Sequence, residues 1–448
     1  MNPYIPQTEK EQKAMLKEIG VESPEELFKH LPEESKLKEP LGLPEGVSEL
    51  ELERHVRALA VKNKVTEEDY VSFLGAGHYQ HFIPAIVDEL AASPQFYTSY
   101  TPYQAEASQG MLQGIFEYQS LVSNLFSMEV SNASLYDGAT AVTEAVLLAI
   151  RRTQKAKVLF SRAIHPEYRR VLETYTRFQP FSIQQIEYRD GITDLEQLEK
   201  ELDNQTAAVV VQHPNFFGYL EEVDRIRELT SSVDALFIVS VDPISLGLLA
   251  PPGEYGADMA VAEGQSLGNY LNYGGSCLGI LTTRKDFIRD LPGRLVGQTE
   301  DREGNRGYVL TLQTREQHIR RQKATSNICT NQALNALRAA IYLSTMGEEG
   351  LKEVARLCFY NSHYAQERIT NISGFKSVFT SPFFKEFVVE CPIPPEEINK
   401  RLLKKGIVGG FGLQKFYPEL KNCMSFCCTE MHGRTQIEQL VHSLGEIS

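Results

Sequence analysis

Short runs of apolar residues alternate with amphipathic stretches through the middle of the chain. Each run is nearly continuous, and helix-like stretches separate several of the runs. Strands that are apolar on both faces are typical of a mostly parallel sheet with helices on both sides. We therefore expect an α/β domain whose strands lie within residues 157–164, 207–213, 236–242, 258–264 and 277–283.

Different patterns flank this region. Ser48 followed by Glu51, and Ser23 followed by Glu26, are capping boxes that predict helices near the N-terminus. A long helical stretch runs from about residue 331 to 369, and strand-like "FFKEFVVECP" and "NCMSFCCTE" with helix-like "TQIEQLVHSLG" follow it. We predict three regions: a helical lead-in at 1–66, a large α/β domain at 67–330, and a linking helix with a small α+β domain at 331–448.

The composition narrows the functional class. The chain has 448 residues, 42% of them apolar, and a formal net charge of −14. This charge argues against non-specific binding to nucleic acid or to anionic membranes. The sequence has no apolar run long enough to span a bilayer, and its polar start is unlike a secretory signal. We expect a cytoplasmic protein, and the net charge does not exclude a small anionic ligand, because local sites override it.

The cysteines and histidines give little sign of a metal site. The seven cysteines form no CxxC pair, so we interpret them as small buried hydrophobic residues in a reducing compartment. His78 and His81 in "GHYQH" share a helical spacing, yet no cysteine or carboxylate pair near them completes a set of zinc ligands. We predict no metal and place both histidines at the surface or in an interface.

The carboxyl ends of the strands are where ligands bind in such sheets. Asp242 ends one run and could hold the protonated ring nitrogen of pyridoxal phosphate, with His213 stacked on the ring. The simpler alternatives are that Asp242 caps the loop before Pro243 and that His213 is a satisfied loop histidine.

The rim loop "GQSLGNYLNYGGSCLG" lacks the amine that a pyridoxal phosphate enzyme needs. No lysine occurs between Glu201 and Arg284, and the loop offers only side chains such as Gln265 and Asn269. A second obstacle is Asp137, which is placed to cap the helix where a phosphate would bind and would repel it. We interpret the rim as a degenerate cofactor site made of Asp137, His213, Asp242, Gln265 and Asn269.

A different segment, "YTSYTPYQAEASQG", predicts a helix start with tyrosines beside it. Thr101 is expected as the cap, Pro102 in the first turn, and Gln104 as the partner that completes a capping box. Tyr100 and Tyr103 would then lie at a helix N-terminus, which favours an anion such as phosphate or carboxylate. The alternative is that both tyrosines only pack against the start of the helix.

Four long motifs carry a resemblance to a known family. "SFLGAGHYQHFIP", "FYTSYTPYQAEASQGMLQGIFEYQ", "REQHIRRQKATSNICTNQAL" and "GGFGLQKFYPEL" are very similar to signatures of the P-protein of the glycine cleavage system, glycine dehydrogenase (decarboxylating). The similarity is to subunit 1, the α subunit, which corresponds to the N-terminal half of the single-chain form. It implies a type I aminotransferase-like fold, as in pyridoxal-phosphate-dependent transferases.

The resemblance also implies a division of labour. A homologous subunit 2 would carry the lysine and pyridoxal phosphate in an α2β2 assembly. That assembly would decarboxylate glycine and pass the aminomethyl group to the lipoyl arm of the H-protein. This chain, inactive alone, would lend groups to its partner's site, and by motif position these are Ser99, Tyr100, Tyr103, Gln104, Thr325, Ser326 and Asn327.

Two other functions stay open at this point. The chain could be a self-sufficient pyridoxal phosphate enzyme that uses another amine, for which Lys323 in "RRQKATS" is the candidate, although it lies outside the rim loops. It could also be a scaffold that only stabilises the partner or docks the lipoyl protein.

Overall fold

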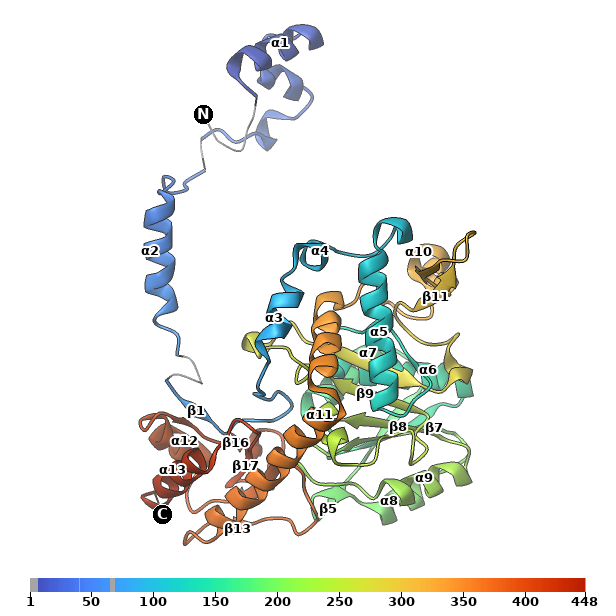
Figure 1. Cartoon of the computed structure of the whole chain (residues 1–448), viewed down its shortest axis with the longest axis vertical. Coiled ribbons are helices and arrows are strands. Elements are labelled where there is room, and N and C mark those ends of the chain that lie inside the picture. Colours follow the sequence, from blue (N-terminus) through green and yellow to red (C-terminus); the bar gives the residue numbers. More distant parts are fainter. Residues whose placement is uncertain (1–6, 40, 65–68, 448) are drawn as a thin grey trace. The chain divides into compact units, whose positions relative to one another are not determined.

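The computed structural model describes residues 7–39, 41–64 and 69–447, and the chain divides into two units, Met1–Lys64 and Val65–Ser448 (Figure 1). The first unit contains α1 (Glu9–Ile19) and α2 (Glu49–Ala60). The capping box predicted at Ser48 is confirmed, whereas the one at Ser23 is wrong because that side chain does not cap the short 3₁₀ helix after it. No helix within the described ranges combines the length and apolar character needed to cross a bilayer.

A seven-stranded sheet forms the centre of the second unit, in the order β2-β10-β9-β8-β7-β3-β4. Strands β9, β8, β7, β3 and β4 are parallel, and β10 is antiparallel to both β9 and β2. The strands span Val130–Ser131 (β2), Lys157–Ser161 (β3), Ser182–Ile186 (β4), Thr206–His213 (β7), Leu236–Val241 (β8), Met259–Glu263 (β9) and Gly279–Thr283 (β10). All five predicted strands are therefore confirmed.

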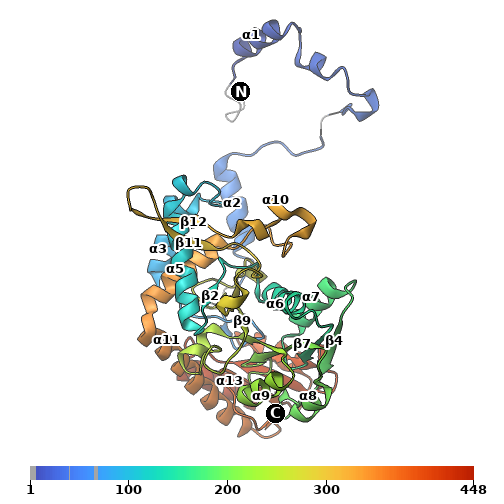
Figure 2. The same ribbon diagram turned by 90° about the vertical axis from the view of Figure 1, so that its right-hand side faces the viewer.

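Both faces of this sheet are buried, as the continuous apolar runs predict. Along β8, Phe237 and Val239 pack into a core with α5, α9 and α11, whereas Ile238 packs into a second core with α6 and α7. Figure 2 shows α6 and α7 beside the sheet. The helices span Gln109–Leu125 (α5), Gly138–Thr153 (α6), Pro166–Thr176 (α7), Leu195–Glu201 (α8), Val223–Ser232 (α9) and Ala333–Thr370 (α11).

The long helix α11 links the central sheet to the C-terminal region. It packs against α3, α5 and α13, and it is kinked at Gly347, whose φ is 60°. The C-terminal sheet has the order β13-β14-β17-β16 and a core of its own. Its elements span Lys376–Ser377 (β13), Glu386–Glu390 (β14), Pro395–Leu403 (α12), Phe411–Gly412 (β16), Cys423–Cys427 (β17) and Arg434–Gly445 (α13).

Three pairs of short strands and three short helices complete the second unit. In one pair, β1 lies parallel to β15, which joins the loop before the large sheet to the C-terminal region. In another, β11 and β12 form an antiparallel hairpin. These elements span Val71–Ser72 (β1), Ala85–Ala91 (α3), Pro94–Tyr97 (α4), Tyr188–Arg189 (β5), Ile192–Thr193 (β6), Val296–Glu300 (β11), Arg306–Leu310 (β12), Gln317–Arg320 (α10) and Ile407–Val408 (β15).

Candidate functional site

The carboxyl ends of β8 and β9 bring two acidic side chains to one rim of the sheet. Val241 is in register with Ala262, so Asp242, which follows β8, and Glu263, which ends β9, lie on neighbouring strands at the same edge. Because β10 returns antiparallel from Gly279 opposite Glu263, residues 264–278 form the loop above this rim. This loop lies within the lysine-free segment between Glu201 and Arg284.

Asp137 caps the start of α6, as predicted, and a second acidic group that was not predicted also binds there. Asp137 is the N-cap, and its carboxylate accepts a hydrogen bond of 2.7 Å from the N–H of Thr140. The N–H of Gly138 donates to Glu263 at 3.0 Å. Two N–H groups that could bind a phosphate at this helix N-terminus are therefore satisfied by carboxylates of the chain itself.

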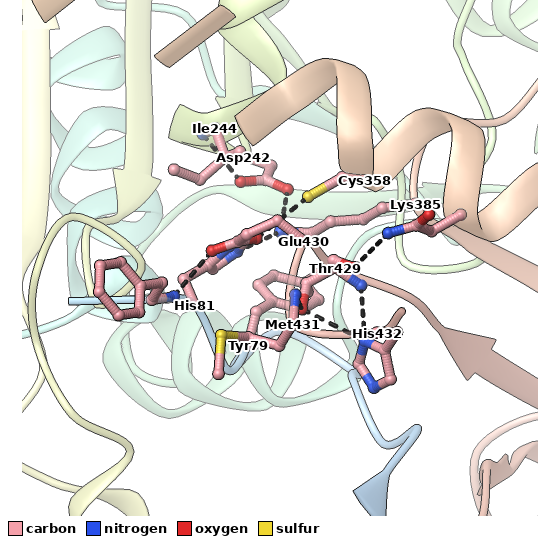
Figure 3. A network of polar contacts seen from close by, with 12 residues as sticks. Tyr79, His81, Asp242, Ile244, Cys358, Lys385, Thr429, Glu430, Met431 and His432 are labelled. Atoms are coloured by element: carbon pink, nitrogen blue, oxygen red, sulfur yellow. Dashed lines mark hydrogen bonds and ion pairs between the residues drawn. The ribbon is translucent and has the colours of Figure 1, made fainter. Parts of the chain in front are cut away.

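Asp242 is paired with a buried amine that the sequence analysis missed. The Nζ of Lys385 lies 2.6 Å from the Asp242 carboxylate and 3.4 Å from the centre of the Tyr79 ring. Figure 3 shows the Lys385 side chain reaching toward Asp242 from the C-terminal region. Burial lowers the pKa of Lys385, but Asp242 and neighbouring thiols outweigh it and hold the pKa above its usual value. The ammonium pairs with one carboxylate oxygen of Asp242, and the other accepts from the N–H of Ile244, so Asp242 also caps the turn that begins at Pro243.

The same ammonium continues into a chain of hydrogen bonds. It donates to Nε2 of His81 at 3.2 Å, because an ammonium has only donors, and Nδ1–H of His81 then donates to Glu430 at 2.7 Å. Burial raises the pKa of Glu430, but His81 and the N–H of Phe82 outweigh it and lower the pKa to about 2. We name Asp242, Lys385, His81 and Glu430 the ammonium cluster. His81 was predicted to lie at the surface or in an interface, and its 6% exposure shows that it is not a surface residue.

The other predicted rim residues serve structural roles. His213 is buried and its Nδ1 accepts from the N–H of Glu221 at 3.0 Å, which is the satisfied-histidine alternative. Burial lowers the pKa of His213 to about 4. Gln265 accepts from the N–H of Tyr79 and donates to the carbonyl of Asn269, so it ties the rim loop to the loop that precedes α3.

A second cluster lies at the rim, and we name it the thiol cluster: His78, Glu263 and Cys277. Nε2 of His78 is 3.4 Å from Sγ of Cys277. Each of the three residues has one atom that could bind a metal ion, and these three atoms lie within 4.8 Å of one another. Burial and the carboxylates of Glu263 and Asp137 raise the pKa of Cys277 to about 12. His78, also predicted at the surface or in an interface, is partly buried here.

The thiol cluster faces a cavity of about 530 Å³. Asp137, His165, Tyr168 and Lys415 also line it. Burial raises the pKa of Glu263 to about 7, although the backbone N–H groups of Leu278 and Gly138 oppose the rise. Sequence reasoning did not find this cluster because His78 and Cys277 come from distant segments.

The predicted helix start at Thr101 is wrong. The N–H of Tyr103 donates to the carbonyl of Thr101, Gln104 precedes a single turn at Ala105–Ala107, and α5 begins only at Gln109. Ser99, Tyr100, Tyr103 and Gln104 instead form an exposed segment before the helix.

One residue of this exposed segment, Tyr103, lies beside Arg294, which also binds residues just after the second predicted segment. Arg294 donates to the carbonyl of Cys329 at 2.7 Å, and its guanidinium lies 5.8 Å from the centre of the Tyr103 ring. Arg294, Cys329 and Tyr103 line a cavity of about 230 Å³, which we name the Arg294 cavity. Arg294 is 6% exposed, and its described hydrogen-bond partners, Cys329, Thr330 and Asn331, are neutral oxygen acceptors. None of these partners carries a negative charge, and the carboxylate of Glu316 lines the same cavity.

Thr325, Ser326 and Asn327 lie directly before the residues that line this cavity. The N–H of Thr325 donates to Arg315, the Ser326 hydroxyl accepts from the N–H of Ile328, and the Asn327 amide oxygen accepts from Gln317. Lys323 is exposed in the short turn just before them.

Comparison with known proteins identifies the family. A family model described as glycine cleavage system P-protein matches residues 2–444. The chain belongs to the glycine cleavage system P-protein family. Two relatives, each named probable glycine dehydrogenase (decarboxylating) subunit 1, are 52% identical: one from Carboxydothermus hydrogenoformans, over 99% of both chains, and one from Moorella thermoacetica, over 98% of both chains.

Solved structures confirm the fold. A crystal structure of glycine decarboxylase (P-protein) in inhibitor-bound form is 43% identical, covers 99% of this chain and 100% of its own, and has a TM-score of 0.92. A Lactobacillus brevis glutamate decarboxylase shares only the fold, with 12% identity, a TM-score of 0.69, and coverage of 92% of this chain and 95% of its own. The predicted type I fold of pyridoxal-phosphate-dependent enzymes is therefore confirmed for this P-protein family member.

Proposed function

We propose that this chain is subunit 1 of a glycine dehydrogenase (decarboxylating) and that it completes the active site of subunit 2. The family match and the names of the relatives support the first part. One observation carries the second part: the Lys385 ammonium is paired with Asp242, in a chain whose rim loop has no lysine. The chain's own rim is thereby closed to the cofactor chemistry of its fold.

The residues at this rim do not fit pyridoxal phosphate. The cofactor needs an amine that can reach its aldehyde carbon, an anion site for its phosphate and a carboxylate for its ring nitrogen. Here the loop after β9 has no amine, Asp137 fills the helix N-terminus, and Asp242 is neutralised by Lys385. Lys385 is no substitute for the missing amine, because its pairing with Asp242 holds it protonated and a protonated amine is not a nucleophile.

The Arg294 cavity is where this chain would contribute to the partner's site. A buried cation beside exposed phenol, hydroxyl and amide groups suits an anion such as a cofactor phosphate or the carboxylate of glycine. We assign Arg294 to binding that anion, and Ser99, Tyr100, Tyr103, Gln104, Thr325, Ser326 and Asn327 to positioning it. In an α2β2 assembly, pyridoxal phosphate on subunit 2 would supply the electron sink for decarboxylation. The aminomethyl group would then pass to lipoylated H-protein, and the seven free cysteines fit work in the reducing cytoplasm.

The test is to assemble this chain with subunit 2, pyridoxal phosphate and lipoylated H-protein, and to measure glycine-dependent bicarbonate exchange. We expect Arg294→Met to lower kcat/KM for glycine at least about tenfold, which corresponds to about 1.4 kcal/mol of lost transition-state stabilisation. The mass of the assembly, measured by light scattering, should not change. Arg356→Met removes an exposed arginine from α11 and serves as the matched control, with unchanged kinetics.

Each alternative predicts a different result. If the chain is only a scaffold or docking subunit, an assembled Arg294→Met enzyme will retain full activity. If the chain is a self-sufficient enzyme, the lone chain mixed with pyridoxal phosphate will develop the absorbance band of a lysine-bound cofactor, and Lys323→Met will abolish the band. Either result would overturn the proposed division of labour.

A further inference from the structure

Two groups of one histidine, one cysteine and one glutamate raise the question of a metal site: the thiol cluster, and His81 and Glu430 of the ammonium cluster together with Cys358. In both places the potential ligand atoms lie within 4.8 Å of one another; the second set is His81, Cys358 and Glu430. In the ammonium cluster both ring nitrogens of His81 are occupied, and a Lys385 ammonium 3.2 Å from Nε2 would repel a dication. The ammonium cluster therefore cannot hold a metal ion.

In the thiol cluster, Nε2 of His78 faces a thiol rather than an ammonium. We propose that His78, Glu263 and Cys277 bind a divalent transition-metal ion of the zinc class. The 3.4 Å between Nε2 of His78 and Sγ of Cys277 matches the separation of about 3.5 Å that bonds of about 2.0 and 2.3 Å give at a tetrahedral zinc ion. The imidazole and thiolate ligands select zinc-like ions over magnesium or calcium.

Glu263 retains the capacity to act as the third ligand. Its Oε1 accepts hydrogen bonds from the N–H groups of Gln265 and Leu278, which uses both lone pairs of that oxygen. Its Oε2 accepts only from the N–H of Gly138 in the described hydrogen bonds, so one lone pair is left. These three bonds fix the carboxylate, and a ligand fixed in place loses little entropy when it binds a metal.

The surroundings provide access and charge. The cluster lines a cavity of about 530 Å³, so the fourth coordination position is open to water or to a small ligand, as in open zinc sites. Asp137 lies close enough to influence both His78 and Cys277, and it adds a second carboxylate that favours a cation. Lys415 also lines the cavity, and its charge opposes binding without belonging to the cluster. A bound ion would join the loop before α3 to the rim loop.

The probe is Co²⁺, added to the full-length chain after metal is removed with a chelator. We expect one equivalent to bind with a near-ultraviolet thiolate-to-cobalt band, and Zn²⁺ to displace it. Cys277→Ser should abolish the band. His78→Phe should weaken binding at least about 100-fold, because loss of even an outer partner of a ligand costs up to about that factor. Cys329→Ser, which removes an exposed thiol, is the matched control and should retain the band.

Thermal unfolding guards against loss of the fold in the variants. Zn²⁺ should raise the midpoint of the wild-type chain and of Cys329→Ser, but not that of Cys277→Ser or His78→Phe. The proposal is overturned if the wild-type chain shows no thiolate band with millimolar Co²⁺. It is equally overturned if the band persists in Cys277→Ser or disappears in Cys329→Ser. These readouts need neither subunit 2 nor glycine, so their failure would leave the proposed function untouched.

Discussion

The ammonium cluster and the thiol cluster each contain a glutamate, and the pKa values of these two glutamates are shifted in opposite directions. In the ammonium cluster Glu430 faces His81 and the N–H of Phe82, and its pKa falls to about 2. In the thiol cluster burial, aided by Asp137, raises the pKa of Glu263 to about 7. Both carboxylates are mostly buried, so the difference comes from their neighbours rather than from depth.

The ammonium cluster is closed by pairing among its own side chains, whereas the thiol cluster is open to a cavity. Lys385 neutralises Asp242, and each side chain of the ammonium cluster has a partner (Figure 3). The thiol cluster contains two acids and a neutral imidazole beside a cavity. One position on this rim is thus closed by internal pairing, whereas the other faces a cavity.

The largest expected effect comes from removing the cation of the ammonium cluster. Lys385→Met leaves the Asp242 carboxylate buried without its partner, and breaking a buried ion pair in this way costs about 3–5 kcal/mol. The change is measured as the free energy of unfolding of the full-length chain in urea. The double variant Lys385→Met/Asp242→Asn should recover part of the loss, because it removes the unpaired charge.

A matched lysine tests whether the effect belongs to the cluster. Lys352→Met removes an exposed lysine paired with Glu348 on α11, and such pairs contribute less than about 1 kcal/mol. If Lys385→Met is no more destabilising than Lys352→Met, the Lys385 ammonium does not hold the rim closed.

The next effect is a pair of opposite pH dependences in metal-free protein. Glu430 has a folded pKa below its ordinary value of 4.5, so its contribution is present above pH 4.5 and is lost as the pH falls toward 2. Glu263 has a folded pKa of about 7, so stability falls as the pH rises from 4.5 to 7. Each pKa shift changes the free energy of unfolding by roughly 3 kcal/mol at most.

Two variants separate these slopes. Glu430→Gln should flatten the acid limb of unfolding free energy against pH, and Glu263→Gln should flatten the limb between pH 4.5 and 7. Other buried glutamates such as Glu221 and Glu386 also have pKa values raised to about 7, so each variant is compared with the wild-type chain at every pH. Parallel curves for wild type and Glu263→Gln would show that Glu263 does not differ from an ordinary glutamate.

The sheet could be predicted from the sequence, because its signal is local and strong. Apolar runs on both faces located β3, β7, β8, β9 and β10. The Asp137 cap was also predictable, since a cap depends on residues within one turn. The helix start at Thr101 failed because a capping box is only permissive: the N–H of Tyr103 bonds back to Thr101, and the helix begins later, at Gln109.

The charge pairings could not be predicted, because they join segments that are distant in the chain. Lys385 reaches Asp242 and His81, and Cys277 reaches His78, only once the C-terminal region and the rim loop are folded. A lysine inside the apolar run "SPFFKEFVVE" is the one local sign that a buried partner exists. Arg294 in "LPGRLVG" gives no such sign.

The smallest expected effect separates the two roles of Asp137, which caps α6 and adds charge to the thiol cluster. Asp137→Ala removes the cap and should destabilise the chain by about 1 kcal/mol, whereas Asp137→Ser keeps a capping hydroxyl and should cost less than about 0.5 kcal/mol. Both variants remove the carboxylate that raises the pKa of Cys277, so alkylation of Cys277 at a fixed alkaline pH should accelerate equally in both. A Cys329→Ser background removes the exposed thiol, and mass spectrometry locates the modified cysteine. If alkylation accelerates only in the destabilised Ala variant, local opening of α6 controls the thiol; equal acceleration in the Ser variant assigns the effect to charge.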